Sequence, residues 1–282
     1  MGQIVYDITE ESFVKRFTTN YDLSILVGED RFFYLVSDTK QNVLVLKGYV
    51  RDNTESNFME SGIKDVFLTD LVLRLPYRTT RIGYIGNDVT LMPEELYDAS
   101  KKSTYFSNVL GKEMKDLDSD TLTSLNIRNI YAFSEGFSQV TKSYFPNAKL
   151  YHIFTALLLG FKEHAKHQDG YNLYGHVWSN KLFLVLYQKD ELIFSNVYDF
   201  ESAHDFLYFV MLIYNQFNLK PESDTINLSG MVIEDSEIHY NLLRYIRYVN
   251  FVPDPTFYRF GSSFRNISKH LFFDLFSLKL CE

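Results

Sequence analysis

Residues 171–199 read YNLYGHVWSNKLFLVLYQKDELIFSNVYD, three short runs rich in β-branched and aromatic residues that two polar breaks separate. The breaks, SNK at 179–181 and KDE at 189–191, are short. Connections of this length join neighbouring antiparallel strands, because a parallel pairing would need a longer crossover. The stretch therefore predicts three consecutive antiparallel strands. Their expected bounds are 171–178, 182–188 and 192–199.

Helices and strands alternate after this meander. Ser202 and Asp205 have the spacing of a helix-capping pair, and the apolar stretch that follows them ends before Pro221. Apolar residues at helical spacing between Ile238 and Val249 predict another amphipathic helix. The remaining expected elements are a strand at 224–229, a weak strand near 250–258 and a helix near 267–280.

The first half of the chain repeats this plan. A helix is expected from Ile63 to Leu75, because apolar residues recur there every four residues and Pro76 stops them. Pro93 is expected to open the next helix. A short strand that runs into an apolar helix over 150–166 links the two halves. The expected strands are 23–27, 31–37, 42–50, 80–86 and 126–133, and the expected helices are 63–75, 93–110 and 135–145.

The order strand, strand, strand, helix, strand, helix, strand, helix thus occurs twice, without residue identity between the two copies. Each copy would form a mixed sheet in which antiparallel hairpins are extended by parallel strands and covered by helices. We therefore predict an α/β protein of two lobes, 1–149 and 150–282, each with the order βββαβαβα.

Composition excludes several classes of protein. With 46% hydrophobic and 17% aromatic residues, the chain has ample material for a packed core. A net charge of −8 and the lack of a dense basic stripe argue against nucleic-acid binding. The single cysteine, Cys281, excludes a disulfide framework. The N-terminus has no signal-peptide pattern and no apolar run is long enough to span a membrane, so a cytoplasmic protein is expected.

Two segments carry a resemblance to a known superfamily: YGHVWSNKLFLVLYQKDEL at 174–192 and INLSGMVIEDSEIHYNLLRYI at 226–246. They resemble the paired ribonuclease H-like lobes of the actin, sugar kinase and heat-shock ATPase superfamily. The nearest members act in bacterial division, pilus assembly and type II secretion. With LYHIFTALL at 150–158 and the LSG turn at 228–230, nearly all of 10–280 resembles a family of Bacteroidetes proteins with an actin-like ATPase fold and no established activity.

The resemblance implies where a nucleotide site would lie. In active members ATP sits between the lobes, and one Asp-x-Gly turn from each lobe holds the phosphates and Mg²⁺, because glycine lets backbone N–H groups approach the phosphates and aspartate anchors the cation. On this chain the first turn falls on Leu26-Val27-Gly28 and the second near His176-Val177-Trp178. Gly28 is retained, but both aspartates are missing.

Two further positions complete the implied cleft. The acidic residue that positions water in many relatives falls near His152, and the adenine turn falls on Ser229-Gly230-Met231, with one glycine where two are expected. Leucine and histidine cannot replace two anionic oxygen ligands of a hard cation. The expectation is therefore no catalytic residue, no metal and no cofactor, with ATP and Mg²⁺ disfavoured. The candidate cleft residues are Gly28, His152, His176 and Gly230.

Other patterns have a functional and a structural interpretation. His152 and His176 could form a pH-sensitive pair across the cleft, but histidines satisfied by neighbouring backbone are more common. The acidic run DLDSD at 116–120 lacks the glycine and terminal glutamate of a calcium loop, so a solvated loop is favoured. The aromatic C-terminal segments 250–264 and 270–276 are interpreted mainly as core, with a docking surface as the alternative.

Two functions follow from these observations. The preferred one is a non-catalytic scaffold, an actin-like protein with a degenerate nucleotide site that binds a protein partner. The alternative is a divergent ATP-binding switch, ATPase or kinase-like enzyme. It would need a clustered set of carboxylates, drawn for example from Asp22, Glu29, Asp30 or Asp199. Homodimerisation is compatible with the resemblance, because the fold often pairs.

Overall fold

The computed structural model describes most of the chain. The described residues are 3–51, 62–86, 88–114, 116–133 and 136–281. The chain forms two compact units. Unit 1 comprises Met1–Ala156, Thr256–Ile267 and Leu275–Glu282, and unit 2 comprises Leu157–Pro255 and Ser268–Asp274. These units differ from the contiguous lobes expected at 1–149 and 150–282, because the C-terminal part of the chain contributes segments to both units.

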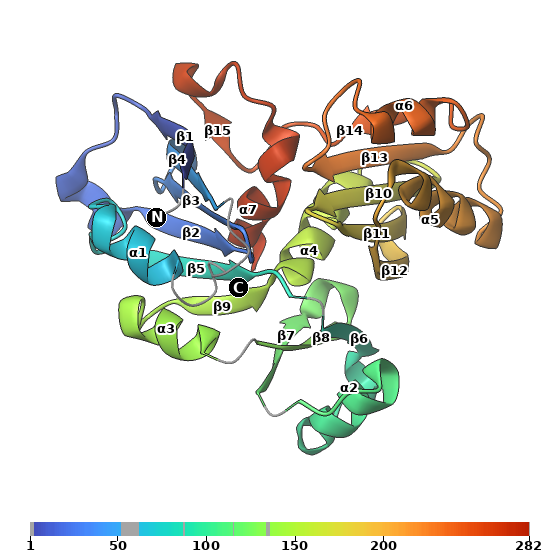
Figure 1. Ribbon diagram of the computed structural model, residues 1–282, viewed down its shortest axis with the longest axis horizontal. Coiled ribbons are helices and arrows are strands. Elements are labelled where there is room, and N and C mark those ends of the chain that lie inside the picture. Colours follow the sequence, from blue (N-terminus) through green and yellow to red (C-terminus); the bar gives the residue numbers. More distant parts are fainter. Residues whose placement is uncertain (1–2, 52–61, 87, 115, 134–135, 282) are drawn as a thin grey trace. The chain divides into compact units, whose positions relative to one another are not determined.

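The main sheet of unit 1 has the strand order β1-β4-β3-β2-β5-β9, and the short strand β15 also pairs with β4 (Figure 1). The bounds are β1 Gln3–Thr9, β2 Asp22–Val27, β3 Arg31–Ser37, β4 Asn42–Val50, β5 Thr79–Tyr84, β9 Lys149–His152 and β15 Arg259–Phe260. Strands β2, β3 and β4 pair antiparallel, whereas β5 is parallel to β2 and β9 is parallel to β5. The expected meander is therefore confirmed, while the sequence pattern did not predict β1 or β15.

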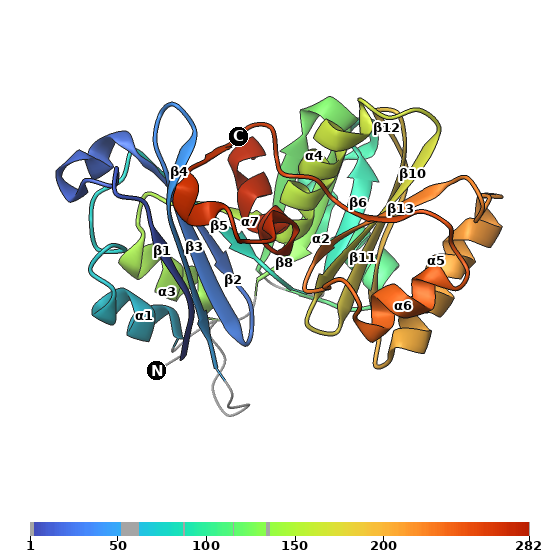
Figure 2. The same ribbon diagram turned by 90° about the horizontal axis from the view of Figure 1, so that it is seen from above.

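Helices α1 (Ile63–Thr69) and α3 (Phe137–Tyr144) pack together in unit 1 (Figure 2). The ring of Phe67 lies 4.8 Å from that of Tyr144 and 5.2 Å from that of Phe145, measured between centroids. Buried residues of both helices join one apolar core with strands β2 to β5. The expected helix at 135–145 is thus confirmed from Phe137 onward, and its first residue lies outside the described residues.

The helix expected over 63–75 is wrong in its second half. Helix α1 ends at Thr69, because Asp70 is extended (φ −94°, ψ 109°) and its carboxylate accepts the backbone N–H of Val72. Leu71, which the periodicity assigned to the buried stripe, is 61% exposed. The same carboxylate accepts the hydroxyls of Tyr34 on β3 and Tyr49 on β4, so tertiary contacts override a helical pattern that continues to Leu75.

A separate small sheet with the order β6-β8-β7 also belongs to unit 1. Its strands are β6 Val89–Pro93, β7 Leu117–Leu122 and β8 Ile127–Ala132, and helix α2 (Lys102–Leu110) packs on it. The helix expected at 93–110 is wrong at its start, because Pro93 ends β6. The expected solvated loop at 116–120 is also wrong: this run enters β7 and buries Asp120. The strand expected at 126–133 forms as β8, within this sheet.

The sheet of unit 2 has the order β12-β11-β10-β13-β14 (Figure 1). Its strands are β10 Tyr171–Trp178, β11 Lys181–Gln188, β12 Glu191–Asp199, β13 Thr225–Gly230 and β14 Val249–Phe251. The antiparallel meander β10-β11-β12 is confirmed, and β13 runs parallel to β10. Because β12, β11 and β10 pair antiparallel while β10, β13 and β14 pair parallel, the sheet is mixed, as the sequence predicts.

Two helices cover part of the sheet of unit 2, α5 (Ala203–Gln216) and α6 (Glu237–Leu243). The expected capping pair is confirmed, since Ser202 and Asp205 form a reciprocal capping box at the start of α5. Helix α6 is shorter than expected, because Val249 belongs to β14. The chain passes between the two units four times: within α4 (Ile153–Ala165), between Pro255 and Thr256, between Ile267 and Ser268, and within α7 (Phe273–Ser277).

The remaining helical segments are short 3-10 turns. They span Lys15–Asn20, Glu94–Leu96, Ala99–Lys101, Thr123–Leu125, Ser262–Phe264, Lys269–Phe272 and Leu278–Leu280. The single helix expected near 267–280 is therefore broken into two such turns around α7. Among the described helices, none combines the length and the apolar character that crossing a bilayer requires.

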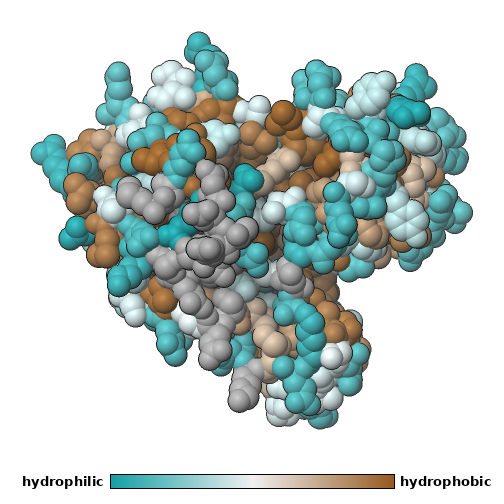
Figure 3. Space-filling model, in the orientation of Figure 1, coloured by the Kyte–Doolittle hydropathy of each residue, from teal (hydrophilic) through white to brown (hydrophobic). Residues whose placement is uncertain are grey.

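The aromatic C-terminal segments belong mainly to the core, as favoured. Tyr258, Phe264 and Phe276 are all at most 6% exposed. Large exposed side chains occur instead on the helices of unit 2, where Tyr208 of α5 and Tyr240 of α6 are each 63% exposed. Over this region, Figure 3 shows hydrophilic, intermediate and hydrophobic residues interspersed. The rings of the C-terminus are therefore not the docking surface that the alternative interpretation places there.

Candidate functional site

His176 lies on β10 of unit 2, opposite Ser229 of the parallel strand β13. Its Nδ1 is 3.0 Å from the Ser229 hydroxyl oxygen, and its Nε2 is 3.2 Å from Oδ2 of Asp274 at the start of α7. His176 and Ser229 are 0% exposed and Asp274 is 1% exposed. Both ring nitrogens thus face polar partners within the core of unit 2.

This row of aspartate, histidine and serine has the order of a hydrolase triad but not its accessibility. A nucleophilic hydroxyl must reach a substrate carbonyl, whereas the Ser229 side chain is fully buried. The arrangement instead attaches the C-terminal segment that carries Asp274 to the centre of the sheet. Sequence reasoning missed Asp274, although it is the one charged residue in the apolar run FFDLFSL at 272–278.

Gly230 ends β13 next to this row. Its φ of +76° is in the left-handed region, and a Cβ there would clash with the carbonyl oxygen of Val177 on β10. The glycine is therefore required by the close approach of two backbones. On the same strand, the hairpin from β10 to β11 turns through Ser179 and Asn180 alone, because Trp178 pairs with Lys181. So tight a turn offers few N–H groups to a phosphate.

Gly28 and His152 lie at the end of the main sheet of unit 1 where its parallel strands finish. Val27, Tyr84 and His152 are in register across β2, β5 and β9, so Gly28 follows at the carboxyl ends of these strands. The Gly28 N–H donates to the carbonyl of Arg31 at 2.9 Å, which closes the β2–β3 turn. Leu26, at the position of the implied metal ligand, is buried.

The His152 ring is hydrogen-bonded to backbone groups. Its Nδ1 accepts the N–H of Phe154 at 3.1 Å, and its Nε2 lies 3.2 Å from the carbonyl oxygen of Gly86. The second contact requires Nε2–H to donate, so the ring is the neutral Nε2–H tautomer. Burial lowers the pKa of His152 to about 4, which keeps the ring neutral near pH 7.

Asp120 of β7 is held in the same part of unit 1. Its carboxylate accepts the hydroxyl of Thr155 at 2.6 Å, the hydroxyl of Tyr131 at 2.8 Å and the backbone N–H of His152 at 3.2 Å. Burial raises the pKa of Asp120 to about 6, although these three donors act in the opposite direction. Asp120 therefore titrates closer to neutral pH than an ordinary aspartate.

The carboxylates that the enzyme alternative requires are dispersed. Asp22 begins β2 and pairs with Arg78, whereas Asp30 follows β2 and pairs with Arg31. Asp199 ends β12 in unit 2 and pairs with Lys181. Within the described ranges, no group of three or more His, Cys, Asp or Glu side chains is arranged to hold a metal ion. Leu26 and His176, at the two positions that the resemblance implies for the metal ligands, carry no carboxylate.

The structure thus brings the four predicted residues together in pairs. Gly28 and His152 share one end of the main sheet of unit 1, and His176 and Gly230 lie on neighbouring strands of unit 2. A cleft that contains all four residues stays a prediction.

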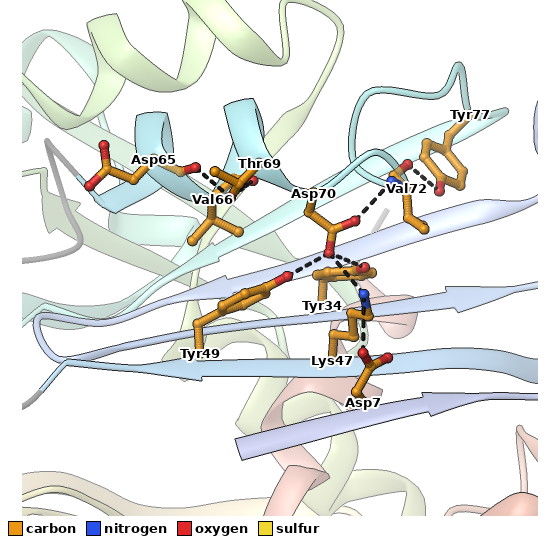
Figure 4. A network of polar contacts seen from close by, with 10 residues as sticks. All are labelled: Asp7, Tyr34, Lys47, Tyr49, Asp65, Val66, Thr69, Asp70, Val72 and Tyr77. Atoms are coloured by element: carbon orange, nitrogen blue, oxygen red, sulfur yellow. Dashed lines mark hydrogen bonds and ion pairs between the residues drawn. The ribbon is translucent and has the colours of Figure 1, made fainter. Parts of the chain in front are cut away.

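A third buried carboxylate, Asp70, organises the helical side of unit 1 (Figure 4). Its Oδ2 accepts the hydroxyls of Tyr49 at 2.6 Å and Tyr34 at 2.7 Å, and lies 3.4 Å from Nζ of Lys47. Burial alone would raise the pKa of Asp70, but the hydrogen bonds from Tyr49 and Tyr34 hold it below its usual range. The sequence offered no signal for this network, whose members are up to 36 residues apart.

Tyr49→Phe removes one charge-assisted hydrogen bond from Asp70 without emptying the core. We expect the free energy of unfolding at pH 7 to fall by about 1.5–3 kcal/mol, the usual range for a hydrogen bond to a charged group. Urea unfolding followed by far-UV circular dichroism measures this loss. Tyr208→Phe, at a 63% exposed ring, is the matched control and should change stability by less than about 0.5 kcal/mol. Equal effects of the two substitutions would contradict the prediction.

The fold is similar to that of solved structures over nearly their full length. A Bacteroides thetaiotaomicron VPI-5482 protein, described as having an actin-like ATPase fold and unknown function, has a TM-score of 0.79 at 18% identity, with 96% of this chain and 99% of that chain covered. A chain of the PilM–PilN type IV pilus biogenesis complex has a TM-score of 0.62 at 13% identity, with 92% and 97% covered. The cytoplasmic domain of EpsL from Vibrio cholerae has a TM-score of 0.43 at 9% identity, with 92% and 94% covered.

The first two similarities confirm the α/β actin-like fold that the sequence predicts. At the level of sequence, the model of one protein family, described as "Protein of unknown function (DUF3822)", matches residues 11–249. No curated protein matches the chain significantly.

Proposed function

The chain belongs to this family, and we propose that it is a non-catalytic scaffold: an actin-like protein that binds a protein partner and has lost metal-dependent nucleotide chemistry. A cytoplasmic location is part of the proposal.

The proposal is supported above all by the environment of His176. At the position that the resemblance assigns to a Mg²⁺ ligand, the side chain is an imidazole whose Nδ1 faces Ser229 and whose Nε2 faces Asp274. A hard cation prefers anionic oxygen, and the fully buried imidazole of His176 offers only nitrogen at this position. The corresponding position in unit 1, Leu26, is an apolar side chain in the core.

A protein partner is supported by one similar structure. The PilM–PilN chain has the same fold and is described as part of a biogenesis complex, so the fold is compatible with a role in assembly. Homodimerisation is a second way in which such a scaffold could act.

Titration with nucleotide tests the loss of catalysis. Isothermal calorimetry with ATP and ADP, each with and without Mg²⁺, should show no binding heat, and the melting temperature should stay unchanged. Binding at 100 times the Kd would stabilise the folded chain by about 2.7 kcal/mol, which shifts the melting temperature by degrees. An actin-like ATPase with both Asp-x-Gly turns serves as positive control. Mg²⁺-dependent binding would reject the proposal and favour the ATP-dependent alternative.

A further inference from the structure

A pocket of about 200 Å³ opens in unit 1, where the connection from α1 to β5 lies beside the connection from α3 to β9. Phe67 of α1 and Tyr144 of α3 contribute rings to its lining. Leu23 at the start of β2 and Tyr77 in the turn before β5 also line it. Arg74, an exposed residue of that turn, also lines it.

Fixed contacts hold the walls of this pocket. The N–H of Val72 donates to Asp70 and the hydroxyl of Tyr77 donates to the carbonyl of Val72, both at 2.8 Å (Figure 4). On the other side, the contact between the rings of Phe67 and Tyr144 joins α1 to α3. A pocket whose walls are already ordered binds a ligand without the entropy cost of arranging them.

No acidic residue of the pocket lining balances the positive charge of Arg74. The lining contains no aspartate or glutamate, and Arg74 forms no ion pair with any residue in the described part of the chain. The nearby Arg78 differs, because its guanidinium donates two hydrogen bonds to Asp22. The pocket therefore combines aromatic and aliphatic side chains with an arginine that has no ion pair among the described residues, which suits a ligand that is partly apolar and carries a carboxylate.

The pocket is separate from the sheet end implied for a nucleotide. Leu23 and Thr80 line it at the beginnings of β2 and β5, whereas Gly28 and His152 lie at the ends of the parallel strands. A ligand here would leave that end unchanged.

We propose that this pocket binds a protein partner through one large apolar side chain flanked by a carboxylate. A volume of about 200 Å³ suits a single side chain, whereas pockets for drug-sized ligands usually have about 300–1,000 Å³. The apolar side chain packs against the rings of Phe67 and Tyr144, which remain in contact with each other, and the carboxylate pairs with Arg74. The inference rests on the proposed scaffold function and specifies the chemistry of the partner.

Short peptides test this chemistry directly. The probes are Ac-Gly-Asp-Phe-Gly-NH2 and its isosteric partner Ac-Gly-Asn-Phe-Gly-NH2, titrated into the ¹⁵N-labelled full chain. We expect the Asp peptide to bind with a Kd of about 1 mM, as suits a ligand of this size. Its shifts should be confined to 67, 73–80 and 144–148. The Asn peptide should bind about tenfold more weakly, because it lacks the charge-assisted pairing.

Three variants assign the effect to the pocket. Arg74→Gln should make the two peptides bind equally, and Ala148→Phe, which fills the lining, should weaken both at least about tenfold. Arg265→Gln removes an exposed arginine elsewhere in unit 1 and should leave both affinities unchanged. If Ala148→Phe does not fold, Arg74→Gln and its control still decide the question.

Several results would overturn the inference. These are equal affinities of the two peptides for the unchanged chain, an unaltered preference in Arg74→Gln, or no shift with either peptide at about ten times the expected Kd. Binding of free 3-phenylpropionate without binding of the Asp peptide would also overturn it, because the ligand would then be a small acid. The nucleotide titration is independent of these outcomes, so failure of the pocket and failure of the scaffold proposal are distinguishable.

Discussion

Asp274→Ala is expected to lower the free energy of unfolding of unit 2 by about 1–3 kcal/mol, the usual cost of leaving a buried polar group without its partner. The substitution removes the carboxylate that lies 3.2 Å from Nε2 of the fully buried His176 ring. It also leaves a cavity where the carboxylate was. The only tryptophan of the chain, Trp178, lies on β10 and is 4% exposed, so its fluorescence during urea unfolding reports on unit 2.

The surface of the same unit provides a matched control. Asp199 pairs with Lys181, but its side chain is 67% exposed, and solvent-exposed ion pairs contribute about 0–1 kcal/mol. Asp199→Ala should therefore have a small effect. An Asp274→Ala variant that loses no more stability than Asp199→Ala would show that the buried contact does not hold the C-terminal segment.

A double substitution separates the two roles of the pair. His176→Leu with Asp274→Leu replaces both polar groups by apolar ones, which in other proteins is often neutral or stabilising. We expect the double variant to recover most of the stability lost in Asp274→Ala. No recovery would mean that the polar pair specifies the packing of Ser229 and its neighbours beyond its electrostatic contribution.

Local patterns predicted the two meanders and the capping box. The breaks at 179–181 and 189–191 are so short that only antiparallel pairing of the flanking strands is plausible. Ser202 and Asp205 each accept a hydrogen bond from the other's backbone N–H within one helical turn. Such features depend on residues close in sequence, so their physics is visible without the rest of the fold. The doubled order of elements then led to the α/β actin-like fold.

The errors arose where distant residues decide a local structure. Helix α1 ends early because Asp70 receives hydroxyls from β3 and β4, and nothing near Asp70 in sequence indicates those donors. The run at 116–120 resembles a solvated loop because a buried carboxylate is expected to be rare. Asp120 is buried nonetheless, since Tyr131 and Thr155 donate to it.

The candidate site shows the same division. The resemblance assigned His176 and Gly230 to one cleft, and the structure places them on the neighbouring strands β10 and β13. It could not indicate that Asp274, almost a hundred residues further along the chain, faces His176. A buried contact between residues so far apart in sequence is decided by the tertiary structure. The only sequence signal for it was a lone aspartate in an apolar run, because a buried polar group needs a partner.

Asp120→Asn and His152→Asn are expected to change the pH dependence of stability in opposite directions. Asp120 has a folded-state pKa raised to about 6, so it stabilises unit 1 at low pH and loses that contribution as pH rises through 6. His152 has a folded-state pKa lowered to about 4, so its contribution is present at neutral pH and is lost as pH falls from about 6.5 toward 4. Burial is the main cause of both shifts.

The two contributions nearly cancel in the unchanged chain. Each shift is about two pKa units, which corresponds to roughly 3 kcal/mol at about 1.4 kcal/mol per unit. Relative to the unchanged chain, Asp120→Asn should therefore lose about 3 kcal/mol more stability between pH 7 and pH 4, because only His152 then titrates. His152→Asn should instead gain about 3 kcal/mol over the same interval, because only Asp120 then titrates. Asparagine suits both positions: at 120 its amide oxygen can accept the same donors, and at 152 it can accept the N–H of Phe154.

Urea unfolding at pH 4, 5, 6 and 7, followed by far-UV circular dichroism, measures these slopes as differences from the unchanged chain, which removes the titration of all other groups. Trp178 fluorescence reports on unit 2 separately and should show no difference between the chains. Parallel slopes in all three chains would mean that neither group titrates between pH 4 and 7 as its burial requires. Opposite slopes would show that unit 1 contains a buried acid and a buried base whose effects on stability offset each other, because burial destabilises the charged form of each.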